Sequence, residues 1–290
     1  MDLVLITGLS GSGKSIALNV LADAGYYCVD NLPGKLFSAL VDTLAASGNR
    51  RVALTIDARS GDDLADFPVH VENLRARGIA FRMLYLDAKD DTLIKRFSET
   101  RRRHPLSDGS RTLPECIAVE RDLLADAAGL ANHFDTSNLS PNALRAWVKD
   151  FVAVPQGGLT LLFESFGFRH GIPLDADLVF DVRCLPNPHY DPVLRPLTGK
   201  DAPVAAFLEA QPDAIALRDD IARFVKSWLP KYGHDNRSYL TVAIGCTGGQ
   251  HRSVWMTEWL ATQFADRPDV LVRHRELVPA LSAEKTPEAR

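Results

Sequence analysis

Cysteine is scarce in this sequence, and the cysteines that are present do not pair by spacing. Cys28, Cys116, Cys184 and Cys246 lie dozens of residues apart, and no two of them form a Cys-x-x-Cys pair. Zinc knuckles and disulfide frameworks of small domains rely on closely spaced cysteines, so neither is indicated. We expect reduced thiols, as in a cytoplasmic protein.

Long apolar runs and a strong excess of charge are also missing. No apolar run approaches the roughly 18 residues needed to cross a bilayer, and residues 1–6 lack the basic segment of a signal peptide. The 33 basic and 37 acidic residues give a net charge of −4, spread evenly over both halves. Net charge therefore does not indicate nucleic acid binding. A hydrophobic content of 46% excludes a disordered chain and predicts a folded protein without membrane spans.

The first half of the chain alternates short apolar runs with segments of helical period. This pattern is typical of βα units around a parallel sheet. Ser140 and Pro141 are an N-cap residue and a first-turn proline, so they predict the start of one helix. The predicted strands are residues 3–7, 26–30, 52–57, 80–87 and 133–136, and the predicted helices are 15–24, 33–47, 63–77, 90–103 and 140–151.

The second half predicts a smaller α/β domain. The turn sequence at residues 155–158 marks a boundary between domains 1–154 and 157–290. Residues 185–192 are rich in proline, which lacks the amide donor that a central strand needs, so they predict a loop. The predicted strands are 159–164, 177–183, 239–245 and 270–273, and the predicted helices are 203–210, 214–231 and 252–264.

The first loop of the chain carries the pattern GxxxxGK[ST] between a predicted strand and a predicted helix. In that context its backbone amides and the helix N-terminus cradle phosphate oxygens. Lys14 would reach the β- and γ-phosphates, and the Ser15 hydroxyl would bind Mg²⁺. The sequence therefore predicts a kinase-like P-loop NTPase domain. Its expected nucleotide-binding residues are Gly8, Leu9, Ser10, Gly11, Ser12, Gly13, Lys14 and Ser15.

Two aspartates end the strands nearest to this loop in sequence. Asp57 closes the run at residues 52–56 and is the candidate for holding the metal or its water, with a turn or N-cap role as the alternative. Asp30 follows another strand and would touch an acceptor in a small-molecule kinase, or serve the turn before Pro33. Lys14, Ser15 and Asp57 are thus the expected catalytic residues, with Ser15 and Asp57 as metal ligands through the nucleotide.

Arginines gather after the fourth predicted helix. Arg101, Arg102 and Arg103 precede a polar stretch that contains Arg111. They could close over phosphates as a lid, or they could be cations at the negative end of a helix dipole. No Asn-Lys-x-Asp motif selects guanine, so the motifs leave ATP and GTP undistinguished.

A second loop between a strand and a helix also suits an anion. Residues 246–253 match Cys-x5-Arg-Ser, in which loop amides and an arginine bind phosphate. We interpret it as a phosphate-ester site; the alternatives are a structural turn or a cysteine phosphatase that uses Asp191 or Asp181 as its acid. His189, Arg195 and Arg183 lie on the same presumed face.

Taken together, these motifs resemble the RapZ/YvcJ family of nucleotide-binding proteins. The resemblance covers about residues 3 to 275 and rests on the segments 8–15, 27–33, 57–60, 165–168, 181–183, 194–199 and 245–253. It implies a P-loop domain that binds and weakly hydrolyses ATP and GTP. The nucleotide contacts that it adds to the loop are Asp57, Ala58, Arg59 and Ser60.

The same resemblance implies a regulatory second domain. In some members of the family that domain senses glucosamine-6-phosphate and binds small RNAs as an adapter for an endoribonuclease, and members are known as oligomers. The pocket residues that it implies are Asp181, His189, Thr247, Gly248, His251 and Arg252. RNA-binding members end in a basic tail, whereas residues 276–290 hold two cations against three acids, which removes phosphate contacts. We therefore expect a cytoplasmic, oligomeric nucleotide-binding sensor, with an RNA adapter and a small-molecule kinase as alternatives.

Overall fold

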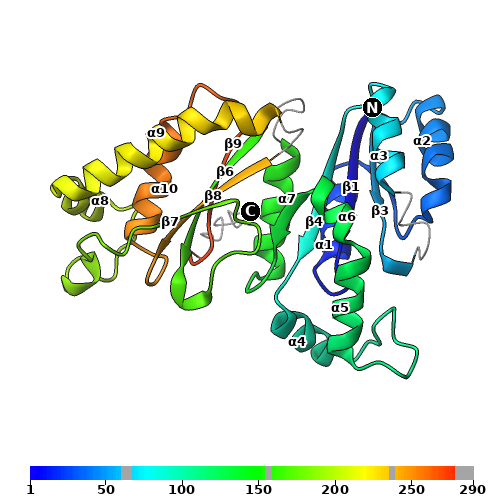
Figure 1. Ribbon diagram of the computed structural model, residues 1–290, viewed down its shortest axis with the longest axis horizontal. Helices are drawn as coiled ribbons and strands as arrows, with labels where there is room; N and C mark the ends of the chain where they lie inside the picture. Colours follow the sequence, from blue (N-terminus) through cyan, green and yellow to red (C-terminus); the bar gives the residue numbers. More distant parts are fainter. Residues whose placement is uncertain (60–66, 154–158, 235–238, 278–290) are drawn as a thin grey trace, which may run out of the picture.

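The computed structural model describes residues 1–59, 67–153, 159–234 and 239–277, which form two lobes side by side (Figure 1). The N-terminal lobe has strands β1 (Asp2–Gly8), β2 (Tyr27–Val29), β3 (Arg51–Thr55), β4 (Phe81–Asp87) and β5 (Asn132–Asp135). Its helices are α1 (Lys14–Asp23), α2 (Phe37–Ala46), α3 (Phe67–Ala76), α4 (Asp90–Thr100), α5 (Leu113–Leu123), α6 (Ala125–Leu130) and α7 (Pro141–Ala153).

The strands of this lobe form one parallel sheet in the order β2-β3-β1-β4-β5. Alternate residues of β1 enter two different cores, because successive side chains of a strand point to opposite faces. Leu3 and Leu5 pack with α2, α3, α5 and α6, whereas Val4 and Ile6 pack with α1 and α7. Both faces are covered, which explains why the strands read as continuous apolar runs.

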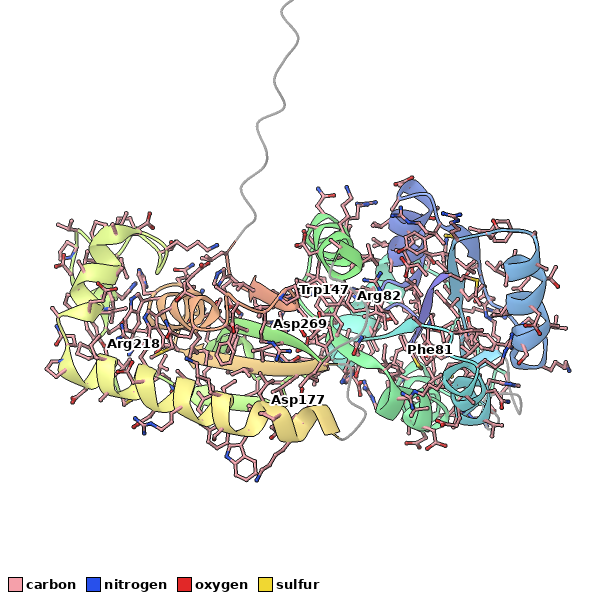
Figure 2. All side chains as sticks on the ribbon, turned by 90° about the horizontal axis from the view of Figure 1, so that it is seen from above. Phe81, Arg82, Trp147, Asp177, Arg218 and Asp269 are labelled. Atoms are coloured by element: carbon pink, nitrogen blue, oxygen red, sulfur yellow. The ribbon has the colours of Figure 1, made fainter. Side chains whose placement is uncertain are left out.

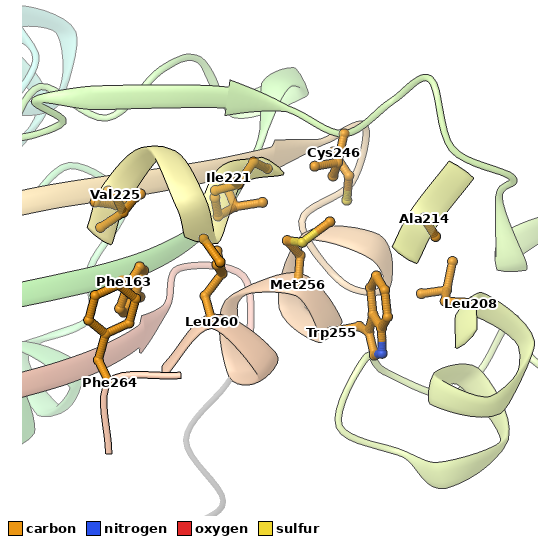
Figure 3. Close-up of a cluster of buried hydrophobic side chains, with 14 of the residues drawn as sticks. Phe163, Leu208, Ala214, Ile221, Val225, Cys246, Trp255, Met256, Leu260 and Phe264 are labelled. Atoms are coloured by element: carbon orange, nitrogen blue, oxygen red, sulfur yellow. The ribbon is translucent and has the colours of Figure 1, made fainter. Parts of the chain in front are cut away.

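The C-terminal lobe has strands β6 (Thr160–Gly167), β7 (Leu178–Asp181), β8 (Tyr239–Cys246) and β9 (Val270–His274), and helices α8 (Ala202–Glu209), α9 (Pro212–His234) and α10 (Arg252–Thr262). The strands form a second parallel sheet in the order β7-β8-β6-β9. Leu161 and Phe163 face the core under α8, α9 and α10, part of which is drawn in Figure 3.

The other face of this second sheet packs against the N-terminal lobe. Leu162 and Tyr239 join the core that contains Phe134, Trp147 and Phe151. Figure 2 places Trp147 where the two lobes meet. The lobes therefore share a continuous apolar contact that includes side chains of α7 and β5.

The predicted α/β class with a P-loop domain and a smaller second domain is confirmed. Every strand predicted from the sequence is present, with bounds shifted by up to three residues. Two helices, α5 and α6, were not predicted. The predicted domain boundary at residues 155–158 and the start of the predicted helix at 63–66 lie outside the described residues. Within the described residues, no helix is long and apolar enough to span a membrane.

Candidate functional site

The first candidate site is the loop between β1 and α1, which contains the GxxxxGK[ST] motif. Gly8 has φ of 130°, and a Cβ atom there would lie 2.0 Å from the carbonyl oxygen of Leu86. Only glycine can bring the loop this close to β4. The loop then opens α1 at Lys14, so a helix N-terminus faces the space above the loop, as phosphate binding requires.

Lys14 folds back over this loop. Its ammonium donates to the carbonyl oxygen of Gly8. Burial lowers the pKa of Lys14, and the charges of Glu120 and Asp57 oppose that shift. The lysine is therefore a cation held inside the loop and surrounded by acids, at the position where the motif places the phosphate-binding lysine.

The strand-end aspartates lie on the same edge of the sheet as Lys14. Asp57 follows β3, which pairs with β1, and its carboxylate accepts from the Arg59 Nε at 2.9 Å and NH2 at 2.7 Å. Asp30 accepts from the Thr55 hydroxyl. The structure thus brings the charges of Asp57 and Arg59 close to Lys14. Ala58 lies between them in the chain, and Ser60 lies outside the described residues.

Side chains distant in sequence hold the loop from behind. The Thr136 hydroxyl, just after β5, donates to the carbonyl oxygen of Ser12 at 2.8 Å. Arg96 of α4 donates to the carbonyl oxygens of Gly11 at 3.0 Å and Thr136 at 2.7 Å. These contacts satisfy carbonyl oxygens of the loop and fix it to α4 and to the end of β5. Sequence reasoning did not identify either residue.

The arginines after α4 are exposed at the surface. Arg101 adopts a left-handed conformation with φ of 52° and ends α4, and Arg102 and Arg103 follow it as exposed residues. Arg111 pairs with Asp108 at 3.3 Å. The lid and the helix-end role of these arginines both stay predictions. The next residue, His104, is buried and contacts the P-loop through Glu120.

The second candidate site is the loop from Cys246 to His251, between β8 and α10. Gly249 has φ of 73°, and a Cβ there would lie 2.7 Å from the backbone nitrogen of Gly167. The buried Arg252 donates to the carbonyl oxygens of Arg183 at 3.0 Å and Leu185 at 2.9 Å. Arg252 thereby ties the loop to the segment after β7.

The six residues that the resemblance implied are gathered around this loop. Arg252 NH2 contacts the Thr247 hydroxyl at 3.3 Å, and the rings of His189 and His251 have centroids 6.2 Å apart. Asp181 ends β7 and pairs with Arg183 at 2.7 Å. Gly248, for its part, follows Thr247 in the loop. Within the described residues, His251 Nε2 and Arg252 Nε are buried and have no hydrogen-bond partner.

Cys246 is the first residue of this loop, but its side chain is buried beneath it. Its side chain packs in the apolar core near Met256 and Trp255, and the residue is 3% exposed (Figure 3). Burial by itself raises the pKa of the thiol, but hydrogen bonds from Ser253 and the Gly249 amide, with the Arg252 charge, bring it below its ordinary value. Because solvent barely reaches the sulfur, the arrangement favours a structural role over a phosphatase nucleophile.

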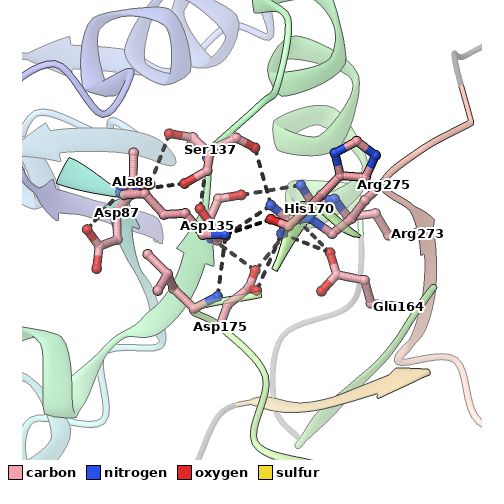
Figure 4. A network of polar contacts seen from close by, with 12 residues as sticks. Asp87, Ala88, Asp135, Ser137, Glu164, His170, Asp175, Arg273 and Arg275 are labelled. Carbon is pink, nitrogen blue, oxygen red and sulfur yellow. Dashed lines mark hydrogen bonds and ion pairs between the residues drawn. The ribbon is translucent and has the colours of Figure 1, made fainter. Parts of the chain in front are cut away.

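A buried ionic cluster connects the lobes between the two loops (Figure 4). Arg275 donates to Asp135 at 2.9 Å and to Glu164 at 3.3 Å, and Arg273 lies 3.2 Å from Glu164 and 3.5 Å from Asp175. Three carboxylates thus share two guanidinium groups. Burial and the nearby charge of Asp175 raise the pKa of Glu164 to about 7. Lys89 adds a contact to the carbonyl oxygen of His170 at 2.8 Å.

A cavity of about 340 Å³ lies between the lobes, lined in part by Asn132, Tyr239 and Thr241. Asn132 and Tyr239 are the first residues of β5 and β8. Both anion-type loops follow the last residues of their strands, so the cavity lies at the opposite edge of the sheets. In parallel α/β sheets ligands bind beyond the carboxyl ends of the strands, and we assign the candidate sites to the loops.

Solved structures offer only a loose likeness, over about half of the chain. A shikimate kinase from Bacteroides thetaiotaomicron is similar over 53% of this chain and 99% of its own, with 13% identity and a TM-score of 0.36. A deoxyadenosine kinase from M. mycoides is similar over 53% of this chain and 99% of its own, with 14% identity and a TM-score of 0.33.

Curated relatives cover nearly the whole chain. A nucleotide-binding protein of Thiobacillus denitrificans is 62% identical over 277 residues, which are 96% of this chain and 100% of that protein. Nucleotide-binding protein azo0399 of Azoarcus sp. is 62% identical over 276 residues, 95% of this chain and 94% of that protein.

The parallel sheet, the GxxxxGK[ST] loop between its first strand and helix, and the inward lysine define a P-loop protein with an α/β fold. The RapZ-like N-terminal domain family matches residues 1–156, and the RapZ C-terminal domain family matches residues 159–278. The chain belongs to the RapZ-like family, and the resemblance seen in the sequence is confirmed. The tail at residues 278–290, on which the RNA expectation depends, lies outside the described residues.

Proposed function

We propose that this protein binds ATP and GTP with Mg²⁺ at residues 8–15 and hydrolyses them weakly, and that its C-terminal lobe senses a sugar phosphate such as glucosamine-6-phosphate. The observation that carries the first part is Lys14, a half-buried residue whose ammonium bonds to the carbonyl oxygen of Gly8 inside a glycine loop at a helix N-terminus. A buried ammonium among backbone amides is poorly solvated, so a phosphate gains more from it there than it would in water.

The donor set near this loop suits a magnesium-bound nucleotide. Ser15 is exposed in the first turn of α1, and Asp57 supplies a carboxylate beside Lys14. Ser15 and Asp57 would hold the ion, which neutralises charge on the β- and γ-phosphates. Arg59 pairs with Asp57 but its side chain is 56% exposed, so it is free to exchange this partner for a phosphate oxygen.

Hydrolysis at such a site needs positioning and charge stabilisation more than covalent chemistry. Water attacks the γ-phosphate, and Lys14 and Arg59 offset the charge that develops on its oxygens. Within the described residues, no group of three or more His, Cys, Asp or Glu side chains could hold a metal by itself. The metal is therefore expected to arrive with the nucleotide.

The sugar-phosphate part rests on the loop from Cys246 to His251. The buried Arg252 and the N-terminus of α10 supply positive potential for a phosphate. His251, the N-cap residue of α10, has a buried Nε2 without a hydrogen-bond partner among the described residues. The carboxylate of Asp181 on the neighbouring strand suits an ammonium or hydroxyl group of a sugar. A phosphate at one end and an acid at the other favour a phosphorylated amino sugar.

The test of the nucleotide function is titration calorimetry with ATP and GTP in the presence of Mg²⁺, followed by an assay of phosphate release. Lys14→Ala should abolish both binding and hydrolysis. Lys149→Ala is the matched control, because Lys149 is exposed on α7. Equal affinity in the wild type and Lys14→Ala would refute the assignment of this loop.

A further inference from the structure

Glu120 of α5 is a buried carboxylate directed at the P-loop. It accepts a hydrogen bond from the backbone amide of Ser10 at 2.8 Å and another from the Ser10 hydroxyl at 2.7 Å. Glu120 is 0% exposed and lies 110 positions from Ser10 in the sequence. A carboxylate is rarely buried this fully without a specific partner. Here both donors belong to the third residue of the phosphate-binding motif.

His104 is the other partner of this carboxylate. The Leu106 amide donates to His104 Nδ1 at 3.2 Å, and His104 Nε2 lies 3.0 Å from a Glu120 oxygen. Since Nδ1 accepts, Nε2 carries the proton and donates to Glu120. The chain of hydrogen bonds thus runs from residue 106 through the imidazole and the carboxylate to the P-loop.

Packing reinforces this chain of hydrogen bonds. The ring of His104 lies 5.2 Å from the ring of Phe97, centroid to centroid. A Cβ added to Gly11 would lie 3.3 Å from the Phe97 ring, so Phe97 packs directly on the P-loop. The segment that begins with the exposed arginines 101–103 is therefore fastened to the loop at its buried end.

Because Glu120 binds Ser10, the loop contains one residue held by the protein and others that can bind a phosphate. The Ser10 amide is already bonded to Glu120, and the Ser12 amide donates to the carbonyl oxygen of Leu9. The amides of residues 11 and 13–15 and the Lys14 ammonium therefore remain for a phosphate. A loop whose third residue is fixed beforehand loses less conformational entropy when a nucleotide binds. The negative carboxylate also stands behind the loop and stabilises the charged form of Lys14.

We propose that Glu120 is a positioning residue of the nucleotide site, with His104 as the residue that orients it. Glu120 holds Ser10 so that the remaining amides and Lys14 meet the phosphates in a preformed arrangement. This inference rests on the nucleotide function proposed above. It adds hydrogen bonds from the P-loop, through Glu120, to the segment 101–112. Neither Glu120 nor His104 is part of the P-loop motif.

The test compares two pairs of variants by calorimetry with Mg²⁺-ATP, steady-state phosphate release and thermal unfolding without nucleotide. Glu120→Ala removes all three acceptor contacts, whereas Glu120→Gln can accept from the Ser10 amide and His104 with its oxygen and donate to the Ser10 hydroxyl. His104→Ala removes the donor, and His104→Gln places an amide N–H near the Nε2 position. Asp122→Asn, an exposed acid of the same helix, is the control.

The expected result is that Glu120→Ala and His104→Ala weaken Mg²⁺-ATP binding at least about tenfold, the value of a hydrogen bond to a charged group. The Gln variants should bind closer to the wild type than to the Ala variants, and Asp122→Asn should match the wild type. If Glu120→Ala does not fold, the Mg²⁺-ATP affinities of His104→Ala, His104→Gln and Ser10→Ala test the inference in its place.

Two results would overturn the inference. One is wild-type affinity in the folded Ala variants; the other is a Gln variant as weak as its Ala counterpart, since restored hydrogen bonds would then have no effect. Failure of the proposed function looks different, because the wild-type protein itself would not bind Mg²⁺-ATP.

Discussion

Arg275 of the C-terminal lobe donates to Asp135 of the N-terminal lobe across 2.9 Å. The next residue after Asp135 is Thr136, whose hydroxyl binds the P-loop carbonyl of Ser12. The next residue after Arg275 is Glu276, whose carboxylate lies against Gly249 of the second loop. A short run of buried contacts therefore joins the two candidate ligand sites through one ion pair.

We expect Arg275→Leu to destabilise the protein strongly. It leaves the buried carboxylate of Asp135 without its ion-pair partner and Glu164 with Arg273 alone, and removing one member of a buried ion pair costs about 3 to 5 kcal/mol. Urea unfolding measures this loss. Arg223→Leu is the control, since the Arg223 side chain is 75% exposed and should cost less than about 1 kcal/mol. Equal losses in the two variants would show that the cluster contributes little.

Glu164 should make stability depend on pH. Burial and Asp175 raise its pKa from 4.5 to about 7 in the folded protein, against the opposing charges of Arg273 and Arg275. The group's contribution to stability is complete below the unfolded pKa and is lost as pH rises through the folded pKa.

Glu164→Gln keeps the shape of this side chain but cannot ionise. The stability of the wild type relative to this variant should therefore fall between about pH 5 and pH 7, as measured by urea unfolding across that range. A difference that does not change with pH would contradict the raised pKa of Glu164.

Asp57→Asn should weaken the effect of Mg²⁺ on ATP binding without weakening the binding of ATP alone. Asp57 is 2% exposed and Asn has nearly the same shape, so the loop should stay intact while the metal ligand weakens. We expect Mg²⁺ to enhance ATP binding about tenfold less in the variant than in the wild type, with binding in EDTA little changed. Calorimetry with and without Mg²⁺ measures both. If Mg²⁺ enhanced ATP binding equally in the variant and the wild type, Asp57 would have only a structural role, as the acceptor for Arg59 and in the turn after β3.

The cysteines should react in the order of their exposure. Cys184 is exposed, while Cys246 is buried despite its lowered thiol pKa. Iodoacetamide at neutral pH should label Cys184 first and Cys246 at least about tenfold more slowly, because access limits the buried thiol. Peptide mass spectrometry gives both rates. Fast labelling of Cys246 in the folded protein would revive the phosphatase interpretation.

Much of the fold could be predicted because its signals are local. Strands such as β1 and β8 are short apolar runs that end in glycine or cysteine at a loop, and the P-loop is a contiguous motif. Helix α5 was missed, although Thr112 and Glu115 form a capping box that marks its start. Attention to the Thr-x-x-Glu spacing would have found it.

The supports of the P-loop could not be predicted in this way. Thr136, Arg96 and Glu120 reach it from positions 85 to 124 residues away. Each has an ordinary local sequence, and only the pairing of β1, β4 and β5 brings them together. Contacts that tertiary packing creates leave no motif in a single sequence.

The most direct measurement of the central claim is a matrix of thermal shifts on the full chain. Wild type, Lys14→Ala and Arg252→Gln would each be melted with Mg²⁺-ATP, glucosamine-6-phosphate, unphosphorylated glucosamine and inorganic phosphate. A ligand at about 100 times its Kd adds about 2.7 kcal/mol, a shift that such a scan resolves. The melting temperatures without ligand report whether each variant is folded.

The account predicts that Lys14→Ala loses the rise in melting temperature with Mg²⁺-ATP and keeps the rise with glucosamine-6-phosphate. Arg252→Gln should keep the first and lose the second. Unphosphorylated glucosamine should not change the melting temperature of any of the three proteins. A wild type stabilised by neither ligand, or a folded Lys14→Ala and Arg252→Gln that respond as the wild type does, would contradict the assignment of the two loops.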